Sequence, residues 1–194
     1  MRLVQSALLF SILMLATNGY SQTVGTEVQR DVNQETRIER GLQSGQLSTG
    51  EAAKLERGEA RIDRMESNAA KDGNVSPQEA ARIQRAQNQE SRQINQLKNN
   101  AVTGDPNSAS SQRMQADVQR NVNQQTRIEQ GVQSGSLTNR EAANLERGQA
   151  HVDKMEAKAG ADGNVGPKEQ KRIQRAENRQ SNKIYREKHN QKVR

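Results

Sequence analysis

Residues 69–79 read AAKDGNVSPQE, and residues 159–169 read AGADGNVGPKE. Both stretches have the composition of a sharp corner between two helices. Gly73 stands where a left-handed residue ends one helix, and Ser76 and Glu79 have the spacing of a capping box that starts the next. A proline follows the serine at the first helical position, where its missing N–H is no loss. The pattern predicts a helix–corner–helix unit that occurs twice.

The corner belongs to a longer duplication. Residues 27–100, here called copy one, align without gaps on residues 117–190, here called copy two, and 43 of the 74 aligned positions are identical. The offset is 90 residues. Between the copies, residues 101–115 read AVTGDPNSASSQRMQ, which has the composition of a linker. A repeat of this kind predicts two equivalent structural units joined by a tether.

Apolar residues recur at helical spacing within each copy. In copy one they are Val28, Val32, Ile38 and Leu42, then Leu55, Ile62 and Met65, then Ile83, Ile94 and Leu97. Intervals of three, four and seven place such residues on one face of a helix. We therefore predict an all-α protein of two tandem three-helix repeats with degenerate EF-hand-like corners. Gly58 and Gly148, inside the second helix of each copy, are expected to mark close helix contacts.

The composition limits the possible chemistry. The chain has no Cys, which excludes disulfides, thiol nucleophiles and thiolate metal sites. His151 and His189 lack the spaced partners of a metal site. Apolar residues make up 30% of the chain, against about 45–50% in globular domains, so each unit is expected to have a thin core. We expect the many carboxylates to face water, with no apolar pocket to shift their pKa values, and we expect no enzymatic activity.

The first residues have the pattern of an export signal. A basic residue precedes an apolar run at 3–16 that is too short to span a bilayer, and small residues follow. We expect cleavage before Gln22 and a periplasmic or secreted protein that is not transmembrane. The expected divisions are a signal peptide at 1–21, repeat one at 22–100, a linker at 101–115, repeat two at 116–190 and a basic tail at 191–194.

The corner at 68–79 also resembles half of an EF-hand calcium loop. With Asp72 at loop position 5, the glycine at position 6 and the glutamate at position 12 are in place. The candidate ligands for calcium or another divalent cation are Asp72, Asn74, Ser76 and Glu79. Positions 1 and 3 hold Asn68 and Ala70, which lack carboxylates, so the pattern favours a metal-free corner. Leu47 and Val75 occupy equivalent apolar loop positions and are expected to pair in a short two-stranded contact.

A family resemblance follows from these motifs. The pattern G-x-L-[ST]-x-x-E, then DG-x-V-x-P-x-E, then N-x-x-S-x-x-I resembles uncharacterised exported proteins of Gram-negative bacteria with EF-hand-like helical repeats. The resemblance covers nearly the whole chain after the signal, twice, and implies export, helicity and an EF-hand-like lineage. LSTGE at 47–51 and LTNRE at 137–141 are similar to a short motif of Spy-type periplasmic chaperones.

The positive charge gathers at the C-terminal end. Residues 168–194 contain ten basic and three acidic residues, within a net charge of +7 for the whole chain. The candidate anion-binding residues on the last helix are Lys171, Arg172, Arg175, Arg179, Lys183, Arg186 and Lys188. Anionic lipid, lipopolysaccharide and unfolded client proteins are the partners that this charge favours. Nucleic acid is not expected, because Tyr185 is the one aromatic residue after the expected signal peptide and offers no stacking platform for bases.

We therefore predict an exported, non-enzymatic binding or stress-type protein of the cell envelope. Three alternatives stay open at this point: a solvated basic face without a partner, cation binding at 68–79, and self-association of helices with thin cores.

Overall fold

The computed structural model describes residues 19–190, with side chains described from Val24 onward. Its helices are α1 (Gly19–Gln43), α2 (Thr49–Ala69), α3 (Pro77–Lys98), α4 (Ala109–Gln133), α5 (Asn139–Ala159) and α6 (Pro167–Lys188). The described part contains no strand, which confirms the all-α prediction. The expected basic tail at 191–194 and residues 1–18 of the expected signal lie outside this range. Residues 19–21 begin α1.

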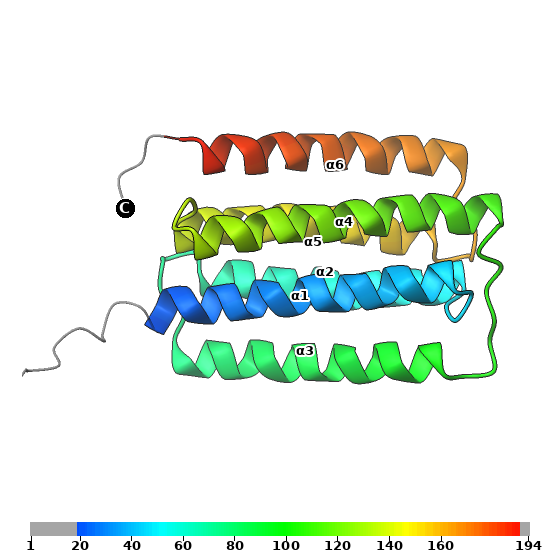
Figure 1. Cartoon of the computed structure of the whole chain (residues 1–194), viewed down its shortest axis with the longest axis horizontal. Helices are drawn as coiled ribbons and strands as arrows, with labels where there is room; N and C mark the ends of the chain where they lie inside the picture. Colours follow the sequence, from blue (N-terminus) through cyan, green and yellow to red (C-terminus); the bar gives the residue numbers. More distant parts are fainter. Residues whose placement is uncertain (1–18, 191–194) are drawn as a thin grey trace, which may run out of the picture.

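The helices lie nearly parallel or antiparallel in a layered bundle (Figure 1). The most extensive contacts join α1 to α4 and α2 to α5, so the helices of copy one pack against their own counterparts in copy two. α3 covers α1 and α2 on one side, and α6 covers α4 and α5 on the other. Each of the central helices α1, α2, α4 and α5 therefore packs against other helices on more than one side.

The apolar core is divided into two clusters, and each draws on both copies. One cluster includes Val24, Val28, Val75 and Ile83 with Ile128, Leu137, Leu145 and Ile184. The other includes Ile38, Leu47, Leu55 and Ile94 with Met114, Val118, Val165 and Ile173. Except for Ala70, whose counterpart is Gly160, the buried members of one cluster are, position by position, the counterparts of the members of the other. The core is thus shared between the copies, which compensates for the low apolar content of each.

Leu47 and Val75 do not pair as expected. They are buried in different clusters, and the described residues around them form no strand. Leu47 shares its cluster with Val165, the counterpart of Val75 in copy two. The prediction was wrong because it assumed that each copy folds on itself, whereas the corners of one copy meet the corners of the other.

The local signals for helix ends are confirmed. Gly45, Gly73, Gly135 and Gly163 have φ values of 74°, 92°, 70° and 84°, the left-handed conformation that lets the chain leave a helix. Capping boxes begin α2, α3 and α5 at Ser48, Ser76 and Thr138. Gly166 begins α6 without a side-chain cap. These features are local, so they form wherever the sequence places them.

Two boundaries differ from expectation. α4 begins at Ala109, inside the expected linker at 101–115, because the Ser108 hydroxyl accepts a hydrogen bond from the Ser111 amide at 3.1 Å and caps the helix. α1 begins at Gly19, within the expected signal peptide at 1–21, and cleavage before Gln22 stays a prediction. No helix among the described residues is both long and apolar enough to cross a bilayer.

Gly58 and Gly148 mark close contacts, as predicted. A Cβ atom at Gly58 would overlap the carboxyl group of Glu90 on α3, and one at Gly148 would overlap the amide of Gln180 on α6. Both glycines therefore admit a polar side chain from an outer helix toward the centre of the bundle.

Candidate metal centre

Acidic and basic residues are sorted between the inside and the outside of this protein. Seventeen of the 23 Asp and Glu residues are buried, whereas no Lys or Arg among residues 24–190 is buried. The expectation that the carboxylates face water was wrong. The carboxylates are buried because copy one packs on copy two and covers helix faces that a separate three-helix unit would expose. Burial of a carboxylate is unfavourable unless a proton, a donor or a cation compensates its charge.

Four of these carboxylates meet in the middle of the bundle. Asp31 from α1, Asp63 and Glu66 from α2, and Glu146 from α5 each bring one oxygen to within 4.8 Å of the oxygens of the others. We call this set cluster A. All four side chains are at most 4% exposed. Three helices from two copies therefore direct four acidic groups to one small volume.

Two amides partly satisfy cluster A. Gln87 Nε2 donates to Asp31 Oδ1 at 2.9 Å and to Glu66 Oε1 at 3.0 Å. Gln125 Nε2 donates to Glu146 Oε2 at 3.1 Å and lies 3.5 Å from Asp63 Oδ1. The second oxygen of each of the four carboxylates accepts no hydrogen bond from an amide, hydroxyl or guanidinium group of the described residues. The same holds for the buried carbonyl oxygen Oε1 of Gln125, so this cluster is rich in acceptors and poor in donors.

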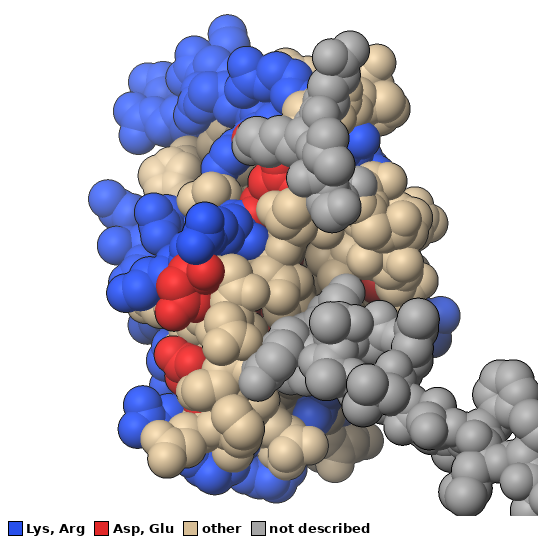
Figure 2. Space-filling view, turned by 90° about the vertical axis from the view of Figure 1, so that its left-hand side faces the viewer, with Lys and Arg blue, Asp and Glu red and all other residues tan. Residues whose placement is uncertain are grey.

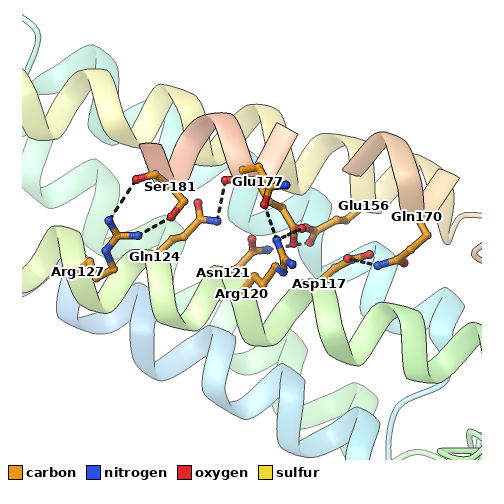
Figure 3. A network of polar contacts seen from close by, with 10 residues as sticks. Asp117, Arg120, Asn121, Gln124, Arg127, Glu156, Gln170, Glu177 and Ser181 are labelled. Atoms are coloured by element: carbon orange, nitrogen blue, oxygen red, sulfur yellow. Dashed lines mark hydrogen bonds and ion pairs between the residues drawn. The ribbon is translucent and has the colours of Figure 1, made fainter. Parts of the chain in front are cut away.

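The equivalent place in the other half holds a second cluster. Glu35, Glu56 and Asp153 bring their oxygens within 4.8 Å of one another, and we call this set cluster B. Asn121, the counterpart of Asp31, directs its amide into this region: Nδ2 donates to Glu156 at 2.8 Å (Figure 3). It also donates to Asp153 at 3.3 Å and lies 3.5 Å from Glu56. An amide donor thus occupies the centre of this half.

The two clusters are joined. Asp63 of cluster A and Asp153 of cluster B are counterparts in the two copies, and their carboxyl groups are close enough to share a hydrogen bond. Such a bond requires a proton on one of them. The clusters therefore form one continuous acidic interior, with Asp63 and Asp153 at the junction.

Burial raises the pKa values throughout this interior. Desolvation is the main cause for Asp31, whose pKa rises to about 6, and for Glu146, whose pKa rises to about 8. Desolvation first and neighbouring carboxylates second hold the pKa values of Asp63 and Glu66 well above their usual range. No ion pair between described residues reaches cluster A. Near neutral pH the empty cluster therefore retains protons.

Arginines on the α1–α4 side hold the outer helices in place. Arg120 on α4 pairs with Glu177 on α6 at 3.3 Å, and Arg127 donates to the hydroxyl and carbonyl oxygens of Ser181 (Figure 3). On the copy-one side, Arg37 donates in the same way to Ser91 on α3. These guanidinium groups act as structural links between helices.

The predicted calcium loop is occupied by capping interactions. The Ser76 hydroxyl donates to Glu79 Oε2 at 2.6 Å, and Asp72 Oδ1 accepts from the Asn74 amide at 3.0 Å. The guanidinium group of Arg140 donates to the Asp72 carbonyl oxygen at 2.9 and 3.0 Å, which brings a positive charge to the loop. The four candidate ligands thus serve the corner, and calcium binding there stays a prediction.

The predicted cations of α6 lie along the outside of the bundle. Lys171, Arg172, Arg175, Arg179 and Arg186 are exposed, and Lys183 and Lys188 are half-buried. Figure 2 shows Lys and Arg side chains gathered at the top of the molecule, where α6 lies, and along one side. The structure therefore leaves this set accessible from the outside.

The sequence did contain a signal for the interior. On α2, Glu56, Glu59, Asp63 and Glu66 recur at intervals of three and four, so they share one helix face with the apolar residues. Between the copies, Asp31, Glu35, Glu59 and Glu90 are replaced by the amides of nearly equal shape Asn121, Gln125, Gln149 and Gln180. Substitution of an acid by the amide of nearly equal shape indicates a position where packing requires that shape while the charge differs between the copies.

Neither the fold nor the site carries a family assignment: no protein-family model, no curated protein and no solved structure matches the chain.

Proposed function

We propose that this protein binds a hard divalent cation, of the Ca²⁺, Mg²⁺ or Mn²⁺ class, inside the bundle at cluster A. The observation that carries the proposal is the meeting of four buried carboxylates, each with an oxygen that accepts no bond from an N–H or hydroxyl group, at a point where no described Lys or Arg forms an ion pair. A cation there would supply the positive charge that the surrounding residues lack.

The ligand atoms select the class of ion. Cluster A offers oxygen only, from carboxylates and from the Gln125 carbonyl, and oxygen ligands suit Ca²⁺, Mg²⁺ and Mn²⁺. Ligands on opposite sides of Ca²⁺ lie about 4.6–5.2 Å apart, twice the Ca–O distance of about 2.3–2.6 Å. One oxygen from each residue of cluster A lies within 4.8 Å of the others, so all four could reach one ion.

In this proposal the chain consists of two tandem three-helix repeats, at 22–100 and 116–190. Both repeats contribute residues to the acidic interior, and their contributions differ. In cluster B the Asn121 amide already donates to carboxylates that a cation would contact. In cluster A the counterpart of this asparagine is Asp31, which adds an acceptor instead of a donor. Cluster A has its own amide donors in Gln87 and Gln125, but it gathers four carboxylates against three in cluster B, and we therefore assign one high-affinity cation to cluster A.

Protons are the natural competitors of the cation. The raised pKa values of Glu146 (about 8), Asp63 and Glu66 mean that the site without a cation holds protons near neutral pH, and a bound cation must displace them. Binding should thus release protons and strengthen as the pH rises.

Calorimetry of the full chain after removal of divalent ions tests the proposal. At pH 7.5, titration with Ca²⁺, Mg²⁺ and Mn²⁺ is expected to give one site per chain with a Kd of about 10⁻⁵ M or tighter for at least one ion. The heat should depend on the ionisation enthalpy of the buffer, because protons are released. Absence of binding by all three ions would overturn the proposal and leave protons as the occupants.

Two variants separate the interior from the surface loop. Glu146→Gln should weaken the interior site and leave the corner at 68–79 untouched. Asp72→Ala should have the opposite specificity. Loss of the heat in Asp72→Ala and its retention in Glu146→Gln would transfer cation binding to the loop.

A second candidate function concerns α6. We propose that the protein is exported, is not an enzyme, and contacts anionic lipid, lipopolysaccharide or unfolded clients in the cell envelope through the seven cations of α6. The exposure of Arg172, Arg175 and Arg179 along one helix supports this proposal. Cosedimentation with anionic vesicles should weaken steeply with salt. Replacement of these three arginines by Gln should abolish it, and unchanged cosedimentation would refute the role of α6.

A further inference from the structure

A basic groove lies on the α2–α5 side, away from the arginines that hold α3 and α6. It encloses about 680 Å³. Its cationic lining residues are Lys54, Arg57, Arg61 and Arg64 of α2 and Lys154 and Lys158 of α5, and we call this set the groove cations. Gly58 and Glu90 also line it. All six groove cations are exposed.

The groove cations have no structural task within the described chain. None of the six forms an ion pair or a side-chain hydrogen bond with another described residue. Arg37, Arg120 and Arg127 differ from them, because each bonds to an outer helix. Glu90, beside Arg61, is the one acidic group among the lining residues, so most of the positive charge of the six cations is unbalanced without a further anion.

We propose that this groove binds a soluble molecule that carries two or more phosphate groups. The four cations on α2 follow one another at intervals of three, four and three residues, so neighbours lie about one helical turn, about 5 Å, apart. Arginine presents paired donors that match phosphate oxygens, and lysine supplies a compact charge. A row of this kind suits several phosphates on one molecule better than a single ion.

The shape of the groove favours a small molecule over a membrane. Its volume lies within the range of about 300–1,000 Å³ that is usual for small-molecule sites. A bilayer surface is flat, and it would contact the rim of a hollow more readily than its floor. The occupant is therefore a soluble phosphorylated compound.

Both copies contribute to this groove, but the equivalent positions on the other half of the bundle lack three of its cations. At the equivalent positions, Asn144 replaces Lys54, His151 replaces Arg61 and Asn68 replaces Lys158. Lys183, the counterpart of the groove residue Gln93, donates to the Asn144 carbonyl oxygen at 2.5 Å and is thereby engaged. These differences provide three substitutions that the same fold already contains at the equivalent positions.

Calorimetry with fructose 1,6-bisphosphate as the probe, and inorganic phosphate as its comparison, tests the proposal. At low ionic strength, the bisphosphate is expected to bind one site at least about tenfold more tightly than phosphate, because charge-assisted bonds add over two groups. Lys54→Asn/Arg61→His/Lys158→Asn should weaken it at least about tenfold. Equal affinities for the two probes would overturn the proposal.

The matched control removes the same number of cations from α6. Lys171→Gln/Arg172→Gln/Arg175→Gln should change bisphosphate binding by less than about twofold, because these exposed charges act only through screened fields. Equal losses in both triple variants would show a response to net charge alone and would refute the groove. Binding to anionic vesicles without binding to the bisphosphate would refute it as well.

Circular dichroism checks that each triple variant folds. Should the groove variant unfold, the single exposed change Lys158→Asn still applies, and an unchanged affinity in it and in Lys54→Asn would overturn the proposal. The titration is repeated with saturating Ca²⁺. Bisphosphate binding that persists without any cation binding would leave the groove standing while the proposal for cluster A fails.

Discussion

Clusters A and B occupy equivalent places in the two halves of one duplicated sequence, but different residues surround the buried carboxylates in each. In cluster B the amide of Asn121 lies among Glu56, Asp153 and Glu156 and donates to them. In cluster A the counterpart Asp31 adds a further carboxylate. Both clusters contain amide donors, but cluster A gathers four carboxylates against three in cluster B and therefore has more buried negative charge to neutralise.

The difference extends through the interior. At four positions, a buried acid of copy one is replaced by an amide in copy two. Glu56, Asp63 and Glu66, in contrast, recur unchanged as Glu146, Asp153 and Glu156. The unchanged acids form a common acidic framework. The exchanged positions set how many buried carboxylates each half contains. Substitution of an acid by its amide, or of an amide by its acid, should therefore move cation binding between the halves.

The largest expected effect is a reversal of the usual response to acid. The raised pKa values of Asp31 (about 6), Glu90 and Asp117 (about 7), and Glu56 and Glu146 (about 8) mean that the folded state binds protons more tightly than the unfolded state. The resulting stability is complete below the ordinary carboxyl pKa and is lost as the pH rises through about 6–8.

For chelator-treated protein, the thermal midpoint should therefore rise as the pH falls from 8 to 5. Each group with unequal proton occupancy contributes up to about 1.4 kcal/mol per pH unit. Saturating cation should flatten the curve by stabilising the protein at pH 8. A midpoint that falls with acid in the chelated protein would contradict the buried, proton-holding interior.

The next effect exchanges one residue between the clusters. Asp31→Asn should lower cation affinity by at least about tenfold, or about 1.4 kcal/mol, and should stabilise the cation-free protein at pH 8 because an amide replaces a buried charge. Asn121→Asp should destabilise that form and add a second cation site. Calorimetry and thermal melts at pH 8 measure both.

The matched pair contains its own control. If both substitutions change cation binding and stability by the same amount in the same direction, the proposed distinction between clusters A and B is wrong.

A smaller effect concerns the glycines that admit the outer helices. A Cβ at Gly148 would displace Gln180, whose Nε2 donates to the Leu145 carbonyl oxygen at 2.8 Å. A Cβ at Gly58 would displace Glu90, whose oxygens have no partner among the described residues. Gly148→Ala should lower the free energy of unfolding by about 1–3 kcal/mol.

Gly58→Ala should lower it by less, because it breaks no hydrogen bond and alanine favours the helix by about 1 kcal/mol. Urea denaturation at pH 7 compares the two variants. A larger loss for Gly58→Ala would indicate that Glu90 has a stabilising partner after all.

The smallest effect compares the corners. Ser76→Ala removes the cap of α3 and should cost about 1 kcal/mol, whereas Gly166→Ser gives α6 the cap that copy one has and should add a few tenths, roughly 0.3 kcal/mol. Gly166 has a φ of −79°, which serine adopts without strain. Thermal melts suffice, and destabilisation by Gly166→Ser would show that the two corners are not equivalent.

The sequence alone predicted much of the local structure. Left-handed glycines, capping boxes and apolar spacing act over a few residues, so all six helices and most of their ends followed from neighbours in the chain. The close contacts at Gly58 and Gly148 were predicted for the same reason. For the candidate metal centre, the spacing of the α2 acids was visible, but nothing local indicated that they are buried.

Tertiary structure decided what lies inside. Whether a helix face meets water depends on what covers it, and here the cover comes from the other copy, 90 residues away, and from α3 and α6. Asp31 and Glu146 meet because α1, α2 and α5 pack together, which no spacing within one helix encodes. Desolvation then raises their pKa values, so the chemistry of the interior is a product of packing.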